Sequence, residues 1–251
     1  MPDRVFREYD LWLTIDQPLF VGGPPDPMSE FHSPVARIGG RAVIPGTSVK
    51  GALRSQLERL LIQQAARNPV FRPCIPFPFS RLSADEHTLV RAGVYRGGAC
   101  EYGKGPICPA CYFLGCQSLP GFVMVPYLEA DKDPEPAYAA ARDRATSAVH
   151  RGFNRNVEVM PPGTTFRGVL RILIEDQQRK WTLGREREHL EPNTDSWLRE
   201  LSHEERHVDR LIDKYVVEPL KSICSIGGKV STGHGWVRGA LEVKLRSEVA
   251  V

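Results

Sequence analysis

The sequence predicts an α+β fold in which strands and helices alternate around one sheet. Three observations predict it. Stretches with period-2 alternation predict strands, and stretches with apolar residues at helical spacing predict helices. The two kinds follow one another in the order strand, helix, strands, helix, strand. Because 251 residues are enough for one core with insertions, we expect a single domain over residues 1–251.

The first strand and the first helix have the clearest patterns. Apolar residues at positions 9, 11, 13 and 15 share one face of the expected strand, and positions 19–21 carry it into a glycine pair. A proline-rich loop follows, which excludes regular structure. Apolar residues at positions 49, 52, 53, 57, 60 and 61 then fall on one face of a helix that starts near Ser48, with Thr47 or Ser48 as its N-cap.

The second half of the chain repeats this alternation of strands with a helix. We expect strands over residues 121–130 and 166–174, a helix over about 202–220 and a last strand over 237–245, with Leu245 facing inward. The complete order fits a βαββαβ ferredoxin-like core.

Two insertions interrupt this core. One covers about residues 70–118 and is rich in Pro, Gly and Cys, and the other covers about 131–163 and is basic. Residues 176–200 are strongly charged and weakly periodic, which predicts a solvated excursion.

Composition narrows the class of protein. The net charge of +3 and the pI of about 8.5 permit a nucleic-acid partner without requiring one. The first residues lack the apolar core of a secretory signal, and no stretch approaches the about 18 consecutive apolar residues of a membrane span. We therefore expect a cytoplasmic protein without a membrane partner. Ser-His-Asp elbow, H-E-x-x-H and Walker motifs are absent, which argues against the enzyme classes that they mark.

The cysteines predict a structural zinc site. Cys108 and Cys111 form a C-x₂-C pair, Cys100 lies eight residues upstream, and Cys74 lies further back. Four thiolates can close a tetrahedral Zn²⁺ shell, which would hold together an insertion that lacks its own core. Cys116 competes with Cys74 for the fourth position, and scattered buried thiols are the alternative to a metal site. We expect the sixth cysteine, Cys224, to be a core residue.

Two glycine-containing basic segments suit a phosphate-rich ligand. The first covers residues 44–55 and offers Lys50 and Arg54. The second covers residues 226–237 and lets backbone N–H groups approach an anion. Its candidate ligand-contacting residues are Gly227, Gly228, Lys229, Ser231 and His234. A flexible turn that needs positive φ angles is the alternative for the second segment. Together the segments predict an RNA-binding protein.

The proline-rich loop carries candidate catalytic side chains. Asp26, Glu30 and His32 lie there, and a loop aspartate or histidine could bind a metal or act as a general base on a ribose 2′-hydroxyl. A solvated loop without a catalytic role is the alternative.

Several blocks of sequence resemble the RAMP superfamily of CRISPR-associated proteins, in particular the repeated backbone subunit of type III effector complexes. The blocks occur in the right order and cover most of the chain. They are FVGG, FHSPVAR, AVIPGTSVKGALRSQLE, CPACYFLG, RDRATSAVHRGFNRNVEVMPPGTTF and GGKVSTGHGWV.

The resemblance implies an RRM-like palm that stacks head to tail with copies of itself and other effector subunits along a CRISPR guide RNA, and that engages single-stranded target RNA. The guide backbone would meet the first helix and the glycine-rich loop, with Arg37 nearby. The basic insertion over residues 131–163 would be the family's thumb, placed between guide and target. Its expected RNA-contacting residues are Arg142, Arg144 and Arg151.

One position departs from the family pattern. Active members place an aspartate just before Ser/Asn-Pro-Val/Ile, where it supports Mg²⁺- or Mn²⁺-dependent cleavage of target RNA, whereas this chain has His32. Imidazole is a poor ligand for Mg²⁺. Three possibilities stay open: a non-cleaving subunit, a metal held by Asp26 or Glu30, and acid–base chemistry by His32.

Two other functions remain as alternatives. A RAMP-type endoribonuclease that processes precursor CRISPR RNA would use His32 as a general base, but such enzymes generally lack the cysteine-rich insertion and the thumb. A zinc-stabilised scaffold without an RNA role is the other alternative.

Overall fold

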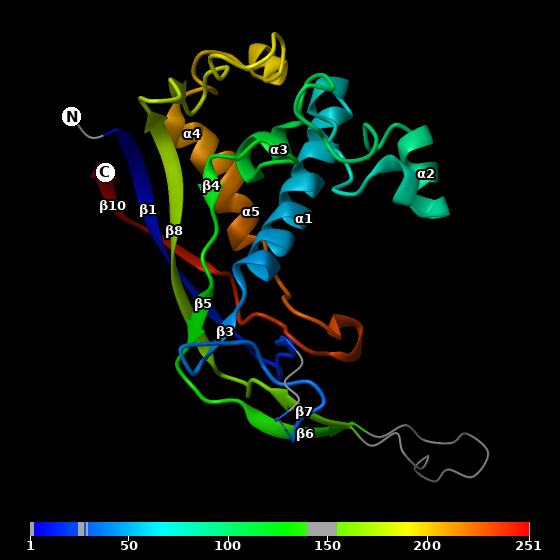
Figure 1. Ribbon diagram of the computed structural model, residues 1–251, viewed down its shortest axis with the longest axis vertical. Coiled ribbons are helices and arrows are strands. Elements are labelled where there is room, and N and C mark those ends of the chain that lie inside the picture. Colours follow the sequence, from blue (N-terminus) through cyan, green and yellow to red (C-terminus); the bar gives the residue numbers. More distant parts are fainter. Residues whose placement is uncertain (1–2, 25–27, 29, 140–154, 251) are drawn as a thin grey trace.

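The computed structural model describes residues 3–24, 28, 30–139 and 155–250. In these residues an eight-stranded sheet has the order β10-β1-β8-β5-β3-β2, with β4 and β9 also paired to β8, and a separate hairpin pairs β6 with β7. Every pairing between named strands is antiparallel. Helices cover one face of the sheet (Figure 1). The predicted mixture of helices with an antiparallel sheet is therefore confirmed.

Three long strands form the centre of the sheet. The first strand, β1 (Arg4–Thr14), lies between β8 (Thr165–Asp176) and β10 (Glu242–Ala250). Tyr9, Leu11 and Leu13 are buried, as their alternation predicts. The pairing of β1 with β10 shifts register between Glu8 and Tyr9. In β10 the prediction is wrong about Leu245, which is 57% exposed although it pairs with the buried Tyr9, because β10 is the outermost strand of the sheet.

Shorter strands extend the sheet beyond β8. They are β2 (Arg37–Ile38), β3 (Arg41–Ile44), β4 (Val123–Met124), β5 (Leu128–Ala130) and β9 (Trp181–Thr182). The backbone that connects β4 to β5 packs against two glycines, Gly46 and Gly168. A Cβ on Gly46 would lie 2.7 Å from the Val125 carbonyl oxygen, and a Cβ on Gly168 would lie 2.7 Å from the Tyr127 carbonyl oxygen. Glycine at both positions is what allows this close approach.

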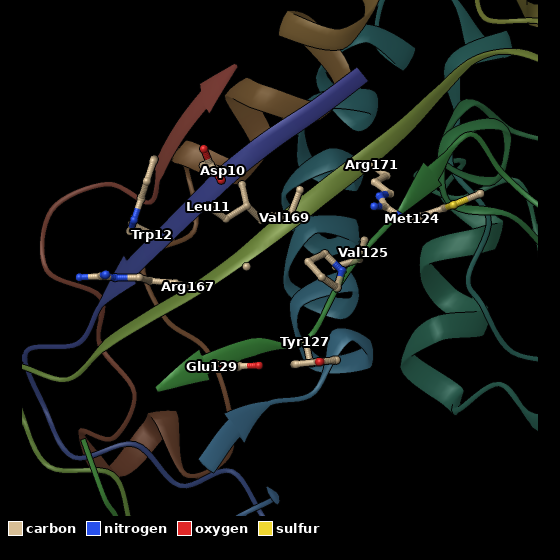
Figure 2. A pocket seen from close by; sticks show the side chains of 12 residues that line it. Asp10, Leu11, Trp12, Met124, Val125, Tyr127, Glu129, Arg167, Val169 and Arg171 are labelled. Carbon is tan, nitrogen blue, oxygen red and sulfur yellow. The ribbon is translucent and has the colours of Figure 1, made fainter. Parts of the chain in front are cut away.

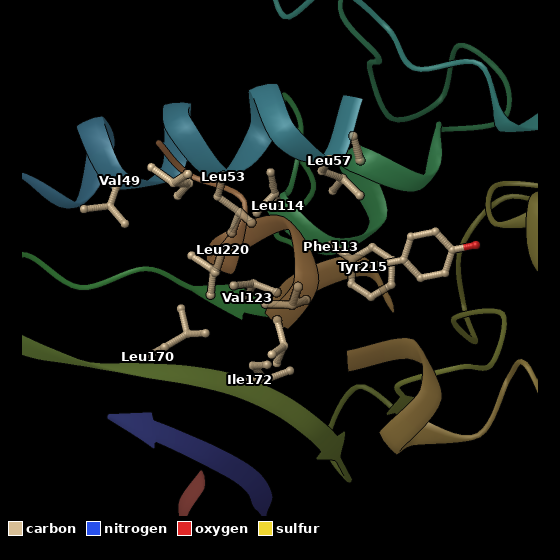
Figure 3. Close-up of a cluster of buried hydrophobic side chains, with 14 of the residues drawn as sticks. Val49, Leu53, Leu57, Phe113, Leu114, Val123, Leu170, Ile172, Tyr215 and Leu220 are labelled. Atoms are coloured by element: carbon tan, nitrogen blue, oxygen red, sulfur yellow. The ribbon is translucent and has the colours of Figure 1, made fainter. Parts of the chain in front are cut away.

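The core lies between the sheet and helix α1 (Gly46–Ala65). The other helical elements on this face are α3 (Pro109–Leu114), α4 (Val208–Ile212), the π-helical turn η4 (Asp213–Val217) and α5 (Glu218–Lys221). Figure 3 shows side chains of α1, such as Leu53, above Leu170 and Ile172 of β8, with Phe113 and Tyr215 at a height between them. Four residues of the apolar stripe predicted for α1 are buried, and Ala52 and Leu60 are partly buried.

Both predicted helices differ from the structure at their first turns. Helix α1 begins at Gly46 after Pro45, and neither Thr47 nor Ser48 caps it with a side chain. A proline at the N-cap fixes an extended backbone there, so the helix starts earlier than the polar residues indicate. The helix expected from residue 202 begins at Val208, because residues 202–207 form turns.

The cysteine-rich segment over residues 70–118 contains more regular structure than predicted. Besides α3 it holds η2 (Phe79–Arg81) and α2 (Ala84–Arg91), and it begins within η1 (Pro69–Phe71). Ser83 and Glu86 form a capping box that starts α2. The remaining elements are β6 (Glu135–Ala139), β7 (Arg155–Val159), η3 (Ser196–Glu200) and η5 (Val230–Thr232). No helix of the described residues is long and apolar enough to cross a lipid bilayer.

The prediction of a solvated excursion over residues 176–200 is wrong. Arg187 and Asp195 form a fully buried ion pair, with Nε–Oδ2 and Nη2–Oδ1 distances of 2.9 and 2.8 Å. The guanidinium lies 5.1–5.7 Å from the ring centroids of Tyr112, Phe122 and Trp181. A buried ion pair surrounded by aromatic rings produces no hydrophobic periodicity. The packing of this charged segment therefore could not be predicted from the sequence pattern.

Candidate functional site

The structure brings four cysteines together. The sulfur atoms of Cys74, Cys100, Cys108 and Cys111 all lie within 4.8 Å of one another, and all four residues are buried. Cys108 is the N-cap of α3, so this short helix fixes the spacing between Cys108 and Cys111. Cys116 lies outside the cluster, half-buried, with its thiol 3.8 Å from the Gln117 carbonyl. The geometry thus selects Cys74 over Cys116 as the fourth member.

The four-cysteine cluster fits a zinc ion in shape and chemistry. Zn–S bonds of about 2.3 Å in a tetrahedron place the sulfurs about 3.8 Å apart. The Cys74 and Cys111 sulfurs are 3.4 Å apart, and no pair in the cluster exceeds 4.8 Å. Hydrogen bonds from the Cys100, Cys108 and Cys111 thiols lower the pKa of Cys74, whereas burial raises the pKa of Cys108. Four protein thiolates leave no open coordination position, so the fitting role is structural.

Arg54 lies against the four-cysteine cluster. Its Nη2 atom is 3.1 Å from the Cys74 carbonyl oxygen and 3.2 Å from the Cys74 sulfur, and its Nη1 atom is 3.8 Å from the Cys111 sulfur. Its Nε atom donates to Glu58 at 2.7 Å, and both side chains of this pair are largely buried. Burial opposes the charged form of Arg54, but the negative charges of Cys74, Cys111 and Glu58 hold its pKa above the ordinary value. The guanidinium predicted to contact RNA is therefore engaged with cysteines.

The two glycine-containing segments meet at one open cavity of about 390 Å³, which we call the glycine groove. It is lined by Phe20, Val21, Gly22, Ser48, Gly51, Ala52, Ser225, Ile226, Gly227, Gly228 and Val230. Gly227 has a φ of +86°, and a Cβ there would lie 2.7 Å from the Phe20 carbonyl oxygen. The Gly228 amide donates to that same oxygen at 2.9 Å. A Cβ added to Gly51 would have no atom within 4 Å, so α1 presents bare backbone to the groove.

Cations stand beside the glycine groove. Lys229 is exposed, in the left-handed region, with its Nζ atom 4.5 Å from the centroid of the Phe20 ring. Lys50 is exposed on α1 and lines a neighbouring cavity of about 610 Å³. Ser231 is exposed, and the Nδ1 atom of the half-buried His234 lies 3.3 Å from the Thr232 hydroxyl.

Strand β2 and the loop before it are tied to β7 through Glu158. Arg37 donates to both carboxylate oxygens of Glu158, at 2.7 and 2.9 Å, and the Val35 amide donates to Glu158 at 2.9 Å. The hydrogen bond from Arg37 lowers the pKa of Glu158. His32 is exposed, and its amide donates to the Asn156 carbonyl at 2.9 Å. The charge of Arg37 is therefore already paired within the protein.

Several predicted site residues lie outside the described part of the chain. They are Asp26, Arg142, Arg144 and Arg151. Glu30 is exposed in the same loop as His32. Within the described residues, only the four cysteines gather as a group of three or more potential metal ligands, and neither Glu30 nor His32 belongs to such a group of described residues.

A cavity that the sequence did not predict lies on the sheet face that points away from α1. It has a volume of about 610 Å³ and includes Asp10, Trp12, Tyr127, Arg167 and Arg171 in its lining. Figure 2 shows these side chains over β1, β8 and the β4–β5 segment. Trp12 and Arg167 are opposite one another in the β1–β8 pairing. The signal was present in the outward positions of both strands, which carry aromatic and charged residues in place of small polar ones.

Comparison with known proteins gives a family and matches among solved structures. The model of the RAMP superfamily matches residues 12–238. A chain in the cryo-EM structure of the Type III-B Cmr-beta bound to cognate target RNA has a TM-score of 0.49 and 13% sequence identity. The match covers 96% of this chain and 61% of that one, so this chain spans less than two thirds of its length. No curated protein matches.

Proposed function

The chain belongs to the RAMP superfamily, and from this premise we propose that it is a guide-RNA-binding backbone subunit of a type III-like CRISPR effector complex. In this role it assembles with copies of itself and other subunits along the guide and engages complementary target RNA. The observation that carries the proposal is the glycine groove, where two segments separated by about 170 residues of sequence form one cavity.

The strand order supports a ferredoxin-like core. In the βαββαβ arrangement two crossover units interleave. Here β1 and β5 would be the first pair, connected through α1, and β8 and β10 the second, connected through α4, η4 and α5. The observed order β10-β1-β8-β5 interleaves them in this way. Residues 70–118 and 131–163 are then insertions, and the β6–β7 hairpin forms the base of the proposed thumb.

The glycine groove suits a phosphodiester backbone and does not suit the reading of bases. Gly51, Gly227 and Gly228 line the groove, and the exposed Lys50 and Lys229 follow or precede these glycines in sequence and supply positive charge. Helix α1 also has no acidic residue in its first turn, so no negative charge there opposes an anion. Contacts of this kind are independent of sequence, so base pairing between guide and target supplies specificity.

The test is the salt dependence of RNA binding by purified protein. Each phosphate contact adds about 0.7 to the slope of log affinity against log salt for single strands. Lys50→Gln and Lys229→Gln should each lower that slope by the value of about one phosphate contact. Lys180 is exposed on the β8–β9 turn, and Lys180→Gln should leave the slope unchanged. Equal effects of all three variants would show diffuse attraction and would contradict a groove. Guide-length RNA that co-purifies with the protein would link the groove to its proposed ligand.

We propose that the loop containing His32 does not support cleavage of target RNA. This loop offers an exposed imidazole, which is a poor Mg²⁺ or Mn²⁺ partner compared with carboxylate oxygen. The assembled complex should therefore leave guide-matched RNA intact, and His32→Asp should create metal-dependent cleavage. Cleavage by the unmodified complex that is lost in His32→Ala or Asp26→Ala would overturn this part of the proposal.

A further inference from the structure

A second cavity lies at the opposite end of α1 from the glycine groove. It has a volume of about 280 Å³ and lies where η1, the segment after α2, and η3 come together. We call it the arginine cavity. Its lining residues are Pro69, Val70, Arg72, Val90, Tyr95, Arg96, Pro106, Ile107, Ser196 and Trp197. The lining contains two arginines and no carboxylate.

Two buried N–H groups at the arginine cavity have no acceptor. Among the described residues, the only buried side-chain nitrogen or oxygen atoms without a hydrogen-bond partner are Nε of Arg72 and Nε1 of Trp197. Both residues line this cavity, and Trp197 is only 1% exposed. Buried donors are rarely left unpaired in folded proteins. Each of these nitrogens exposes less than 1 Å², so a molecule in the cavity reaches them through a small shift of the two side chains.

The charge around the arginine cavity selects the chemistry of that molecule. Neither Arg72 nor Arg96 makes an ion pair with any described residue. Guanidinium and indole N–H groups only donate, and Ser196 adds a hydroxyl. The Tyr95 hydroxyl is 3.4 Å from a Glu58 oxygen and thus already has a partner. A ligand that matches this lining accepts several hydrogen bonds and carries negative charge.

We propose that the arginine cavity is a binding site for a small oxyanion of phosphate type. Guanidinium groups favour oxyanions because their planar N–H forks match two oxygen atoms at once. The volume is well above the about 30 Å³ that one water occupies in the liquid, so the cavity has room for a tetrahedral anion. This site is independent of the glycine groove, since the two cavities share no lining residue.

Phosphate titration of the full-length, zinc-loaded protein tests the proposal. Calorimetry is done in a buffer without oxyanions, with chloride holding the ionic strength constant, and acetate serves as a planar anion for comparison. Saturable phosphate binding that is tighter than acetate binding is expected. Arg96→Gln and Arg72→Gln should each weaken it by about tenfold or more, as expected for the loss of a charge-assisted hydrogen bond.

Arg91→Gln is the matched control, because Arg91 is exposed on α2 and does not line the cavity. Arg96 is exposed as well, so its variant should fold even if Arg72→Gln does not. No saturable phosphate effect, or an equal loss in Arg91→Gln, would overturn the proposal. A crystal structure of protein soaked in phosphate that shows an ordered water only between the two N–H groups would overturn it too.

Discussion

Replacing Arg54 by Gln should weaken zinc binding and leave RNA binding by the zinc-loaded protein unchanged. The guanidinium lies 3.2 Å from the Cys74 sulfur and donates to the neighbouring carbonyl at 3.1 Å. It thus supplies positive charge beside a cluster that would carry four thiolates. Loss of groups that support metal ligands typically costs 10–100-fold in metal affinity, which equals about 1.4–2.8 kcal/mol.

The same substitution has a second cost, which must be separated from the first. Glu58 pairs with Arg54 at 2.7 Å, and their side chains are only 13% and 14% exposed. Removing one partner of a buried ion pair costs about 3–5 kcal/mol, because the other charge stays buried. Burial already raises the pKa of Glu58. The variant should therefore unfold at lower urea concentration, and the double variant Arg54→Gln/Glu58→Gln should recover much of that loss.

Zinc affinity is measured by competition with a chromophoric chelator. The effect of Arg54 on the metal is isolated by comparing the zinc affinity of the double variant with that of Glu58→Gln alone. Arg59→Gln is the control on the same helix, since Arg59 is exposed and contacts only Gln56. Unchanged zinc affinity together with a lower salt slope for RNA binding would refute the reasoning. That result would mean that Arg54 turns toward RNA in solution.

Three further predictions follow from single contacts. Asp195→Ala should lower the free energy of unfolding by about 3–5 kcal/mol, because it leaves the fully buried Arg187 without a charged partner. Replacing Arg187 and Asp195 together by apolar residues should cost much less. Urea titration measures the free energy of unfolding of both variants. Gly168→Ala should destabilise by about 1–3 kcal/mol, since its Cβ would lie 2.7 Å from a backbone carbonyl, and the melting temperature reports this. Glu158 has a lowered pKa in the folded protein, so its contribution is complete above its unfolded pKa of about 4.3 and is lost as pH falls through the folded value. Acid unfolding should therefore begin at higher pH in Arg37→Gln than in the unmodified protein, and an unchanged onset would contradict that role of the ion pair.

Local patterns were enough for the elements that bury one regular face. The alternation in β1 and the apolar stripe of α1 each follow from a fixed period, so the sequence predicts them well. A cysteine metal site could also be predicted, because irregular chain around a C-x₂-C pair favours metal. Cys116 could not be excluded on spacing alone, since only the fold decides which thiols meet.

Contacts between residues distant in sequence were not predictable in this way. Arg187 and Asp195 look like surface charges until Tyr112 and Phe122 are placed around them. Cys224 was expected in the core by its apolar character and is exposed, because the chain has already left α5 at that point. Each error has the same cause: burial of an isolated residue depends on the partner element and not on local period.

Helix α1 connects the features that matter for function. It has 20 residues and is thus about 30 Å long. Its first turns line the glycine groove. Arg54, one turn after Lys50, contacts the cysteines. The 3₁₀ helix η1, which follows the last turn of α1, borders the arginine cavity. The contacts of Arg54 fix how α1 lies against the cysteine-rich segment. A zinc ion held there would therefore maintain the groove without touching RNA, and its removal should weaken RNA binding even though Lys50 and Lys229 stay intact.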